Sequence, residues 1–288
     1  MHFKNKIILL ILIIVICAIF EIIFINHKYK YFKDDLTLVS AYYQVKSKHS
    51  NYEYLSWLRN ILLLNKSLVF FTSKNLLPII KKLRPIKLHY KTKFIDLEME
   101  DFYVYKNFRN EFNKSFYIDP ENSYHTIPLY MIWAEKNMFL KRAILNNHFH
   151  SKCFYWIDAG YFREKKIYMK KYINNWPSTK KCFEDKRVLM GQVKNFSYFE
   201  KNKIVNFDIT AIKNVENDIN VIGGLFGGQA NNILIFGDYY YKALNKYSNQ
   251  SLFIGKDQNI YTFVAFSHPE IVKLVFFPNY LFFKVYLK

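Results

Sequence analysis

The sequence predicts an α/β domain with parallel strands, and three stretches carry the prediction. Residues 36–43 (LTLVSAYY) and 67–73 (SLVFFTS) are apolar or β-branched runs of strand length. Each is followed by a helical pattern, over residues 52–64 and 75–85 respectively. Two strand–helix units in succession are typical of parallel pairing. The third stretch, residues 153–160 (CFYWIDAG), is continuously apolar up to its acid, as a strand covered on both faces is.

The later part of the chain continues the alternation of strands and helices. We expect one long helix, a short strand, a strand that ends in a glycine loop, two helices and a last strand, over residues 126–146, 186–193, 219–228, 230–247, 256–266 and 271–277. Residues 165–186, rich in Lys and Asn, are expected to form a surface excursion.

Composition limits the classes of protein to consider. The 288 residues are 51% hydrophobic, which is enough for a full core, and the formal net charge is +19. That charge would suit a polyanionic partner such as a nucleotide diphosphate, but an AT-rich coding sequence would enrich Lys and Asn equally well. The basic residues form no stripe and no nucleic-acid reader motif is present, so nucleic acid is not an expected partner.

The N-terminus predicts a membrane anchor. Residues 7–25 (IILLILIIVICAIFEIIFI) contain one charged side chain, Glu21, and are long enough to cross a hydrocarbon core of roughly 30 Å as a helix. A cleaved signal peptide is the alternative, but no small-residue cleavage site follows the run. We therefore expect an anchor at residues 1–26, a charged tether at residues 27–35 and a catalytic domain at residues 36–288.

Asp158 ends a buried strand and precedes two small residues, Ala159 and Gly160. In open α/β sheets, ligands bind beyond the carboxyl ends of the strands. A carboxylate there can hold a divalent ion that neutralises a diphosphate. The alternative is a helix N-cap or a turn-forming Asp before Gly, and the local sequence does not separate the two.

Three further features could belong to a site. The stretch GGLFGG supplies Gly223, Gly224, Gly227 and Gly228, which make either tight turns or room for a sugar or phosphate. In the stretch KDQN, Asp257 is either a helix N-cap, or an acid that is directed at a sugar hydroxyl or acts as a general base, and Gln258 follows it. Lys136 lies on an apolar helical face, where it either extends to water or neutralises a leaving phosphate.

Cys153 and Cys182 could form one disulfide, although spacing alone is weak support.

The order of these segments resembles the HtrL/YibB family of glycosyltransferase-like proteins. The matching features are TLVSAYY, YLSWLRNILLLNKSLVFFTS, a helix with Trp133 and Lys136, NNHFHSKCFYWIDAGYFR, VIGGLFGG and KDQN, over about residues 36–275. The resemblance implies a GT-A-like fold, that is, a Rossmann-type mixed sheet flanked by helices. It also implies sugar transfer from a nucleotide-diphosphate donor to a glycan, protein or lipid.

The resemblance also implies roles for individual residues. Asp158 takes the place of the acid that holds Mn²⁺ or Mg²⁺ and the donor phosphates, but the usual second acid is missing, because Trp156 and Gly160 flank it at that spacing. Asp257 and Gln258 take the catalytic, sugar-contacting place. The other donor-site residues are Ser40, Tyr42, Lys136, Ala159, Gly160 and Arg163, and the loop for sugar and acceptor is Gly223, Gly224, Gly227 and Gly228.

The sequence therefore predicts a single-pass, membrane-anchored glycosyltransferase, facing the lumen of the ER or Golgi if the source has an endomembrane system. The missing second acid leaves a different class open. In that alternative the chain keeps a GT-A-like fold and its anchor but has no activity, and binds a glycan or a protein partner.

Overall fold

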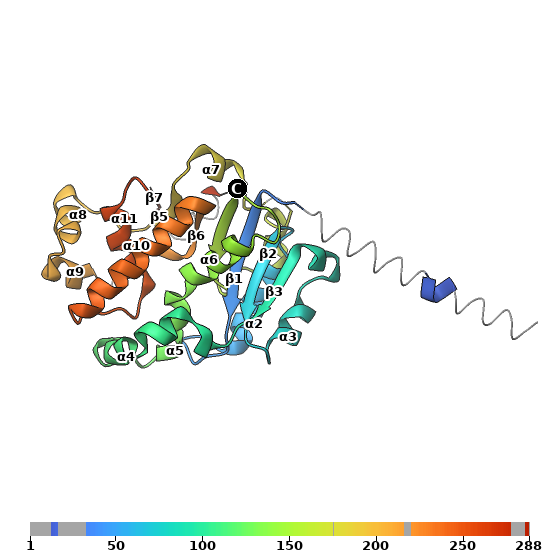
Figure 1. Ribbon diagram of the computed structural model, residues 1–288, viewed down its shortest axis with the longest axis horizontal. Helices are drawn as coiled ribbons and strands as arrows, with labels where there is room; N and C mark the ends of the chain where they lie inside the picture. The colour runs from blue at the N-terminus through green and yellow to red at the C-terminus, as the bar shows by residue number, and fades with distance from the viewer. Residues whose placement is uncertain (1–12, 17–32, 175, 216–219, 278–285, 288) are drawn as a thin grey trace, which may run out of the picture.

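The computed structural model describes residues 13–16, 33–174, 176–215, 220–277 and 286–287. This part is built around one seven-stranded sheet flanked by helices (Figure 1), which confirms the predicted α/β class. The strands are β1 (Leu36–Tyr42), β2 (Ser67–Thr72), β3 (Thr92–Asp96), β4 (Cys153–Ile157), β5 (Val188–Gln192), β6 (Val221–Gln229) and β7 (Val272–Phe276).

The sheet is mixed because one strand runs against the others. The strand order is β3-β2-β1-β4-β6-β5-β7. The pairs β1–β2, β2–β3, β1–β4 and β5–β7 are parallel, which confirms the parallel pairing expected for the first two strands. Strand β6 is antiparallel to both β4 and β5. The beginning of β6 therefore lies at the same edge of the sheet as the carboxyl ends of β1 and β4.

The described α-helices between residues 33 and 277 cover both faces of the sheet. They are α2 (Asn51–Leu62), α3 (Leu77–Leu83), α4 (Tyr103–Ile118), α5 (Ile127–Ala134), α6 (Lys136–Asn146), α7 (Lys180–Glu184), α8 (Tyr198–Val205), α9 (Ile209–Val215), α10 (Ala230–Asn249) and α11 (Asp257–Ser267). Short 3₁₀ turns lie at Ile86–Lys91, Met99–Asp101 and Lys166–Lys171. Helices α6 and α10 lie side by side along one face (Figure 1).

Alternate residues of the strands point to opposite faces of the sheet and pack into two separate hydrophobic cores. Val39 and Val69 pack with α4, α5, α6, α10 and α11 on one face. Leu38 and Leu68 pack with α2 and α3 on the other face. The second core also contains Met169, Tyr172 and Trp176, all at most 2% exposed. The surface excursion expected at residues 165–186 is therefore confirmed only in part: most of its lysines are exposed, but its buried apolar side chains pack on the sheet.

Two predicted elements differ from the structure. The single helix expected over residues 126–146 is two helices, α5 and α6, which meet at Glu135. The stretch GGLFGG is not a loop but part of strand β6, because Leu225 and Phe226 between the glycine pairs are fully buried on opposite faces. Strand geometry places successive side chains on opposite faces, so both cores are served by one continuous strand.

A buried disulfide joins Cys153 at the start of β4 to Cys182 on α7. Both cysteines are 0% exposed. The predicted anchor at residues 1–26 lies outside the described residues except for residues 13–16, which are helical. None of the helices in the described ranges is long and apolar enough to cross a membrane.

Candidate functional site

A pocket of about 390 Å³ opens at the carboxyl ends of β1 and β4. It contains seven of the residues predicted for the site, namely Tyr42, Asp158, Ala159, Gly160, Arg163, Gly224 and Gln258. Its other walls are largely aromatic, with Tyr43, Tyr54, Trp133, Trp156 and Tyr161. A larger hollow of about 580 Å³ lies between α8, α11 and β7, and contains none of the predicted residues.

Asp158 leaves β4 directly into this pocket. Its backbone N–H donates to the Gly224 carbonyl at 2.9 Å, and its carbonyl accepts from the Tyr161 N–H at 2.9 Å. The carboxylate accepts a hydrogen bond from Nε1 of Trp156 at 2.6 Å and is 33% exposed. No described helix begins here, so the N-cap alternative is excluded. The backbone forms the turn that was considered, while the side chain remains available to the pocket.

Lys136 joins Asp158 to Asp257 below the pocket. Its Nζ lies 3.0 Å from Oδ1 of Asp158 and 2.8 Å from Oδ2 of Asp257. It also donates to the Gly223 carbonyl at 3.1 Å. The lysine side chain is 2% exposed, so it does not extend to water as the alternative required. Three groups from α6, β4 and α11, far apart in sequence, thus form one ionic cluster.

Burial controls the protonation of this cluster. Burial raises the pKa of the Asp257 carboxyl above its usual range, while the Lys136 ammonium counters part of that effect. For the ammonium itself, burial acts to lower the pKa, but Asp158 and Asp257 together raise it above its ordinary value. Lys136 therefore carries its charge at neutral pH, held by the two carboxylates.

The two predicted catalytic residues, Asp257 and Gln258, lie in different places. Gln258 lines the pocket. Asp257 is the first residue of α11 but lies behind the pocket, with its side chain 6% exposed. The N-cap of α11 is Lys256, so the alternative that made Asp257 the cap is wrong. Asp257 contacts Lys136, so it can affect a substrate in the pocket only indirectly, through that lysine.

The four glycines also divide into two pairs. A Cβ at Gly224 would lie 3.1 Å from Oδ2 of Asp158, and one at Gly223 would lie 3.0 Å from Oδ2 of Asp257. These two glycines allow β6 to pass close to the acids. Gly227 and Gly228 pair with Tyr155 and Phe154 inside the sheet and do not line the pocket. Their assignment to a substrate loop is wrong, because β6 carries them into the sheet between β4 and β5.

The remaining predicted donor-site residues take different positions. Ser40 is fully buried and its hydroxyl donates to the Ile157 carbonyl at 2.7 Å, so it ties β1 to β4 without reaching the pocket. Tyr42 lines the pocket and donates to Oδ1 of Asn51 at 3.3 Å. Arg163 lies exposed at the rim, where its guanidinium stacks 4.5 Å above the ring of Trp57.

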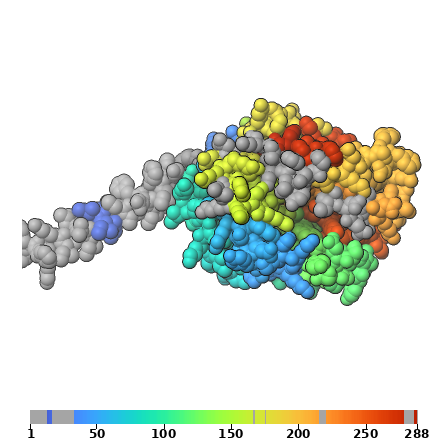
Figure 2. Space-filling model, turned by 180° about the vertical axis from the view of Figure 1, so that it is seen from behind, coloured from blue at the N-terminus to red at the C-terminus, as the bar shows by residue number. Residues whose placement is uncertain are grey.

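An aromatic cluster on α2 was not predicted from the sequence. Tyr54 and Trp57 lie over Gly160, where a Cβ would meet their rings at 3.0 and 3.3 Å. His49 stacks edge-on against Trp57 at 4.8 Å. The i, i+3 spacing of the two aromatic residues places them on one helix face, which is a recognisable signal. What that face would cover depends on tertiary contacts, such as the bond from Asn60 to the Phe162 carbonyl. Figure 2 shows α2 (blue) and the segment after β4 (yellow-green) on the same side of the molecule.

A second group of titratable residues lies beside the pocket wall. Asp119, Glu121 and His125 offer ligand atoms within 4.8 Å of one another, so this group could hold a metal ion. Its members already have partners, because Asp119 accepts hydrogen bonds from His125 and Tyr130, and Glu121 pairs with Lys256. His125 also packs edge-on against Trp133 of the pocket, at 5.2 Å.

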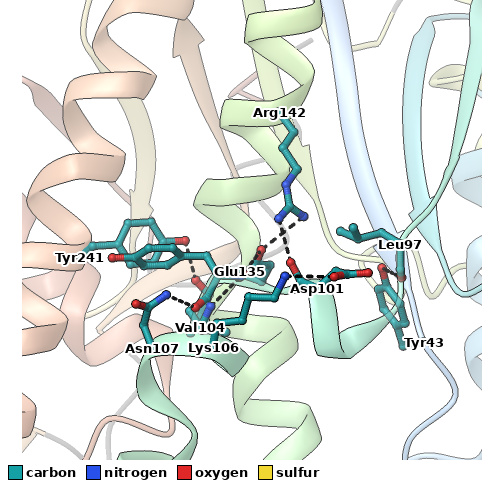
Figure 3. A network of polar contacts seen from close by, with 11 residues as sticks. Tyr43, Leu97, Asp101, Val104, Lys106, Asn107, Glu135, Arg142 and Tyr241 are labelled. Atoms are coloured by element: carbon teal, nitrogen blue, oxygen red, sulfur yellow. Dashed lines mark hydrogen bonds and ion pairs between the residues drawn. The ribbon is translucent and has the colours of Figure 1, made fainter.

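Glu135 lies at the junction of α5 and α6 and is held by a network of polar contacts (Figure 3). Its carboxylate accepts from the backbone N–H groups of Tyr103 and Val104, at 3.0 and 3.1 Å, and so caps the beginning of α4. Arg142 approaches the same carboxylate at 3.4 Å. Because Glu135 is fully buried and precedes Lys136, the bonds that fix it also fix the start of the helix that carries the lysine.

Glu135 is expected to make stability depend on pH. Burial raises the pKa of Glu135 from an ordinary 4.5 to about 7. The folded state therefore binds the proton more tightly, so this contribution is complete below pH 4.5 and is lost as pH rises through 7. We expect the wild-type free energy of unfolding to fall by roughly 2 kcal/mol from pH 5 to pH 7 through this group. Urea titrations at the two pH values measure it. Glu135→Gln should remove the dependence, and the exposed control Glu100→Gln should keep it; equal slopes in all three proteins would contradict the assignment.

The comparison with curated proteins gives no match. Among solved structures, the chain is similar to core-mannan synthase A (CmsA/Ktr4) from Aspergillus fumigatus in its Mn/GDP form. The identity is 11% and the TM-score 0.48, over 84% of this chain and 73% of that chain.

The family comparison covers nearly the whole described domain. A family model described as a bacterial protein of unknown function (HtrL_YibB) matches residues 34–286. These residues include every strand of the sheet and all the pocket residues named above. The resemblance seen in the sequence is confirmed, and the chain belongs to the HtrL/YibB family.

Proposed function

We propose that the protein is a glycosyltransferase that moves a sugar from a nucleotide-diphosphate donor to a glycan, protein or lipid acceptor. The observation that carries the proposal is the pocket at the carboxyl ends of β1 and β4, where the partly exposed carboxylate of Asp158 lies among aromatic rings. Ligands of open α/β sheets bind at this edge. Aromatic rings pack on the flat faces of sugars and bases, and a carboxylate accepts hydrogen bonds from sugar hydroxyls.

The residues around Asp158 suit the parts of such a donor. Arg163 presents a guanidinium at the rim, and planar donors of this kind match phosphate oxygens. Gly224 leaves room for a sugar beside the carboxylate, since a side chain there would meet Asp158. Gln258 adds an amide to the same pocket. In this arrangement Arg163 stabilises the charge that develops on the departing diphosphate.

The two acids have different roles in the proposal. Asp158 faces the pocket and contacts the donor sugar, whereas Asp257 is buried and acts through Lys136. Asp257 is thus a positioning residue that holds the lysine against Asp158. This assignment differs from the sequence hypothesis, in which Asp257 itself contacts the sugar.

The location in the cell is also part of the proposal. The apolar run at residues 7–25 supports a membrane anchor that precedes the transferase domain. The buried disulfide between Cys153 and Cys182 supports a domain on the oxidising side of that membrane, because such bonds persist there. In a cell with an endomembrane system, this is the lumen of the ER or Golgi.

A panel of nucleotide sugars tests the proposal. The wild-type protein is expected to hydrolyse or transfer from at least one donor, and Asp158→Asn is expected to lower kcat about 100-fold or more, since it removes the carboxylate from the reacting sugar. Product formation followed by mass spectrometry, with and without EDTA, is the measurement. The matched control is Asp238→Asn, an exposed acid on α10 that is paired with Lys141. An activity that Asp158→Asn leaves intact would exclude the role given to this carboxylate.

A non-catalytic protein that binds a glycan or a partner is the second candidate. One observation favours it: Asp257 is 6% exposed and held by Lys136, so the pocket has a single accessible carboxylate among the residues that line it. Binding of a nucleotide or sugar without turnover of any donor would favour this candidate.

A further inference from the structure

Four oxygen atoms surround the ammonium of Lys136. They are both carboxylate oxygens of Asp158, at 3.0 and 3.2 Å, Oδ2 of Asp257 at 2.8 Å, and the Gly223 carbonyl at 3.1 Å. Carboxylate and carbonyl oxygens are the ligands that Mg²⁺, Mn²⁺ and Ca²⁺ take in proteins. The structure has therefore assembled an oxygen cage typical of a cation site, and the cation inside it is a side chain of the protein.

The divalent ion that the family resemblance implies at Asp158 does not fit these residues. A Mg²⁺ ion bound by that carboxylate would lie about 2.0–2.1 Å from one of its oxygens. Both oxygens already lie within 3.2 Å of Lys136, and one also accepts from Nε1 of Trp156 at 2.6 Å. A metal there would lie against a fixed positive charge and would compete with it for the same lone pairs.

Lys136 is not free to leave the cage. It is the first residue of α6, and the preceding residue is held by the cap that Glu135 makes on α4. Its side chain is 2% exposed and its ammonium lies 5.8 Å from the centre of the Trp156 ring. Displacement of the ammonium would also leave the buried Asp257 without its counter-charge, which is costly in a protein interior.

We propose that Lys136 takes the place of the divalent cation, so that the pocket binds its nucleotide diphosphate without metal. This inference rests on the proposed function for the identity of the ligand, but the claim about Lys136 stands on the cage alone. Lys136 balances the charge of the two acids below the pocket. Arg163, stacked on Trp57 at the rim, then faces the phosphates, and Asp158 faces the sugar hydroxyls.

Titration of the free protein with Mn²⁺, followed by electron paramagnetic resonance, tests the claim about Lys136. Wild type and Asp158→Asn are expected to bind the same amount of Mn²⁺. Lys136→Ala should gain one Mn²⁺ site, because the emptied cage keeps two carboxylates and a carbonyl. That site should disappear in the double variant Lys136→Ala/Asp158→Asn. Mn²⁺ should also raise the Tm of Lys136→Ala by more than it raises that of wild type, because a ligand that binds the folded state stabilises it.

Two controls isolate the cage. Lys141→Ala removes a lysine of the same helix that pairs with Asp238 at the surface, and it should gain no Mn²⁺ site. Mn²⁺ held by Asp119, Glu121 and His125 would persist in Asp158→Asn and disappear in His125→Gln, so it is counted separately.

Several results would overturn the proposal. Wild-type binding of Mn²⁺ that Asp158→Asn abolishes would show that the lysine does not exclude the metal, and this titration needs no Lys136 variant to fold. A folded Lys136→Ala without a new site would show that the cage is not a cation site. Binding of UDP or GDP to wild type only when Mn²⁺ is present would contradict the metal-free pocket. Absence of nucleotide binding with and without Mn²⁺ would instead refute the proposed function, while the Mn²⁺ titration alone would still decide the role of Lys136.

Discussion

Lys136→Met is expected to lower the free energy of unfolding by about 3–5 kcal/mol, because removal of one partner leaves buried charge without compensation. The change keeps most of the aliphatic volume, so the loss reports the ammonium rather than a cavity. Asp257 would be the group most affected, since its side chain is 6% exposed and Lys136 lies 2.8 Å from it. Urea unfolding at pH 7, followed by circular dichroism, measures the difference.

The surface variant Lys141→Met is the control, because it shows how much the free energy of unfolding changes when a lysine outside the cluster is lost. Lys141 lies on the same helix and is 43% exposed, with Asp238 at 3.7 Å. Exposed pairs of this kind contribute about 0–1 kcal/mol. Asp257→Asn combined with Lys136→Met should recover part of the loss, because it removes the orphaned charge. A loss below about 1 kcal/mol in Lys136→Met would show that the cluster does not hold the two acids as described.

Gly227→Ala is expected to cost about 3 kcal/mol or more, at the upper end of what overpacking costs. A Cβ at this position would lie 2.4 Å from the Phe154 carbonyl oxygen and 2.6 Å from the Tyr155 Cα. Those atoms belong to the backbone of β4, so no side-chain rotation relieves the contact. The antiparallel β4–β6 pair must separate, and thermal unfolding should report a large decrease in Tm.

Two other glycines supply the comparison. Gly224→Ala meets a side-chain oxygen of Asp158 at 3.1 Å and is expected to impair the pocket more than the fold. Gly237→Ala, on α10, meets nothing closer than 3.5 Å and should stabilise the protein by roughly 0.5–1 kcal/mol through the helix propensity of alanine. Similar Tm values for Gly227→Ala and Gly224→Ala would contradict the different positions that the structure gives them.

Strand ends were the most predictable part of the site. The run of apolar residues that stops at Asp158 placed this acid at the carboxyl end of a central strand, and the structure agrees. That prediction depends only on local pattern and on the rule that ligands bind beyond the carboxyl ends of strands. Tyr42 at the end of β1 also lines the pocket, but it was expected there only from the family resemblance.

The direction of β6 could not be predicted from the sequence of the strand alone. Glycine pairs are typical of turns, and nothing local shows that GGLFGG runs through the sheet against β4. That direction decides which glycines meet the acids: Gly223 and Gly224 lie beside Asp257 and Asp158, whereas Gly227 and Gly228 lie inside the sheet. The Rossmann-type mixed sheet itself was expected only from the family resemblance.

Contacts across the fold were the least predictable. Lys136 and Asp257 are 121 positions apart, and their pairing follows from the packing of α6 and α11 against α10 rather than from either local sequence. The aromatic cover formed by Tyr54 and Trp57 likewise needs α2 to lie over Gly160. Local sequence assigned chemistry to Lys136 and Asp257 but none to Tyr54 and Trp57, and tertiary structure determined which of these residues face the pocket.

Isothermal titration calorimetry with UDP and GDP in EDTA is the most direct test of the nucleotide-diphosphate site. We predict that wild type binds at least one of the two without metal. Arg163→Ala should weaken that binding at least tenfold, about 1.4 kcal/mol, because it removes the guanidinium from the phosphates. Failure of wild type to bind either nucleotide, or equal affinities for wild type and Arg163→Ala, would contradict the account.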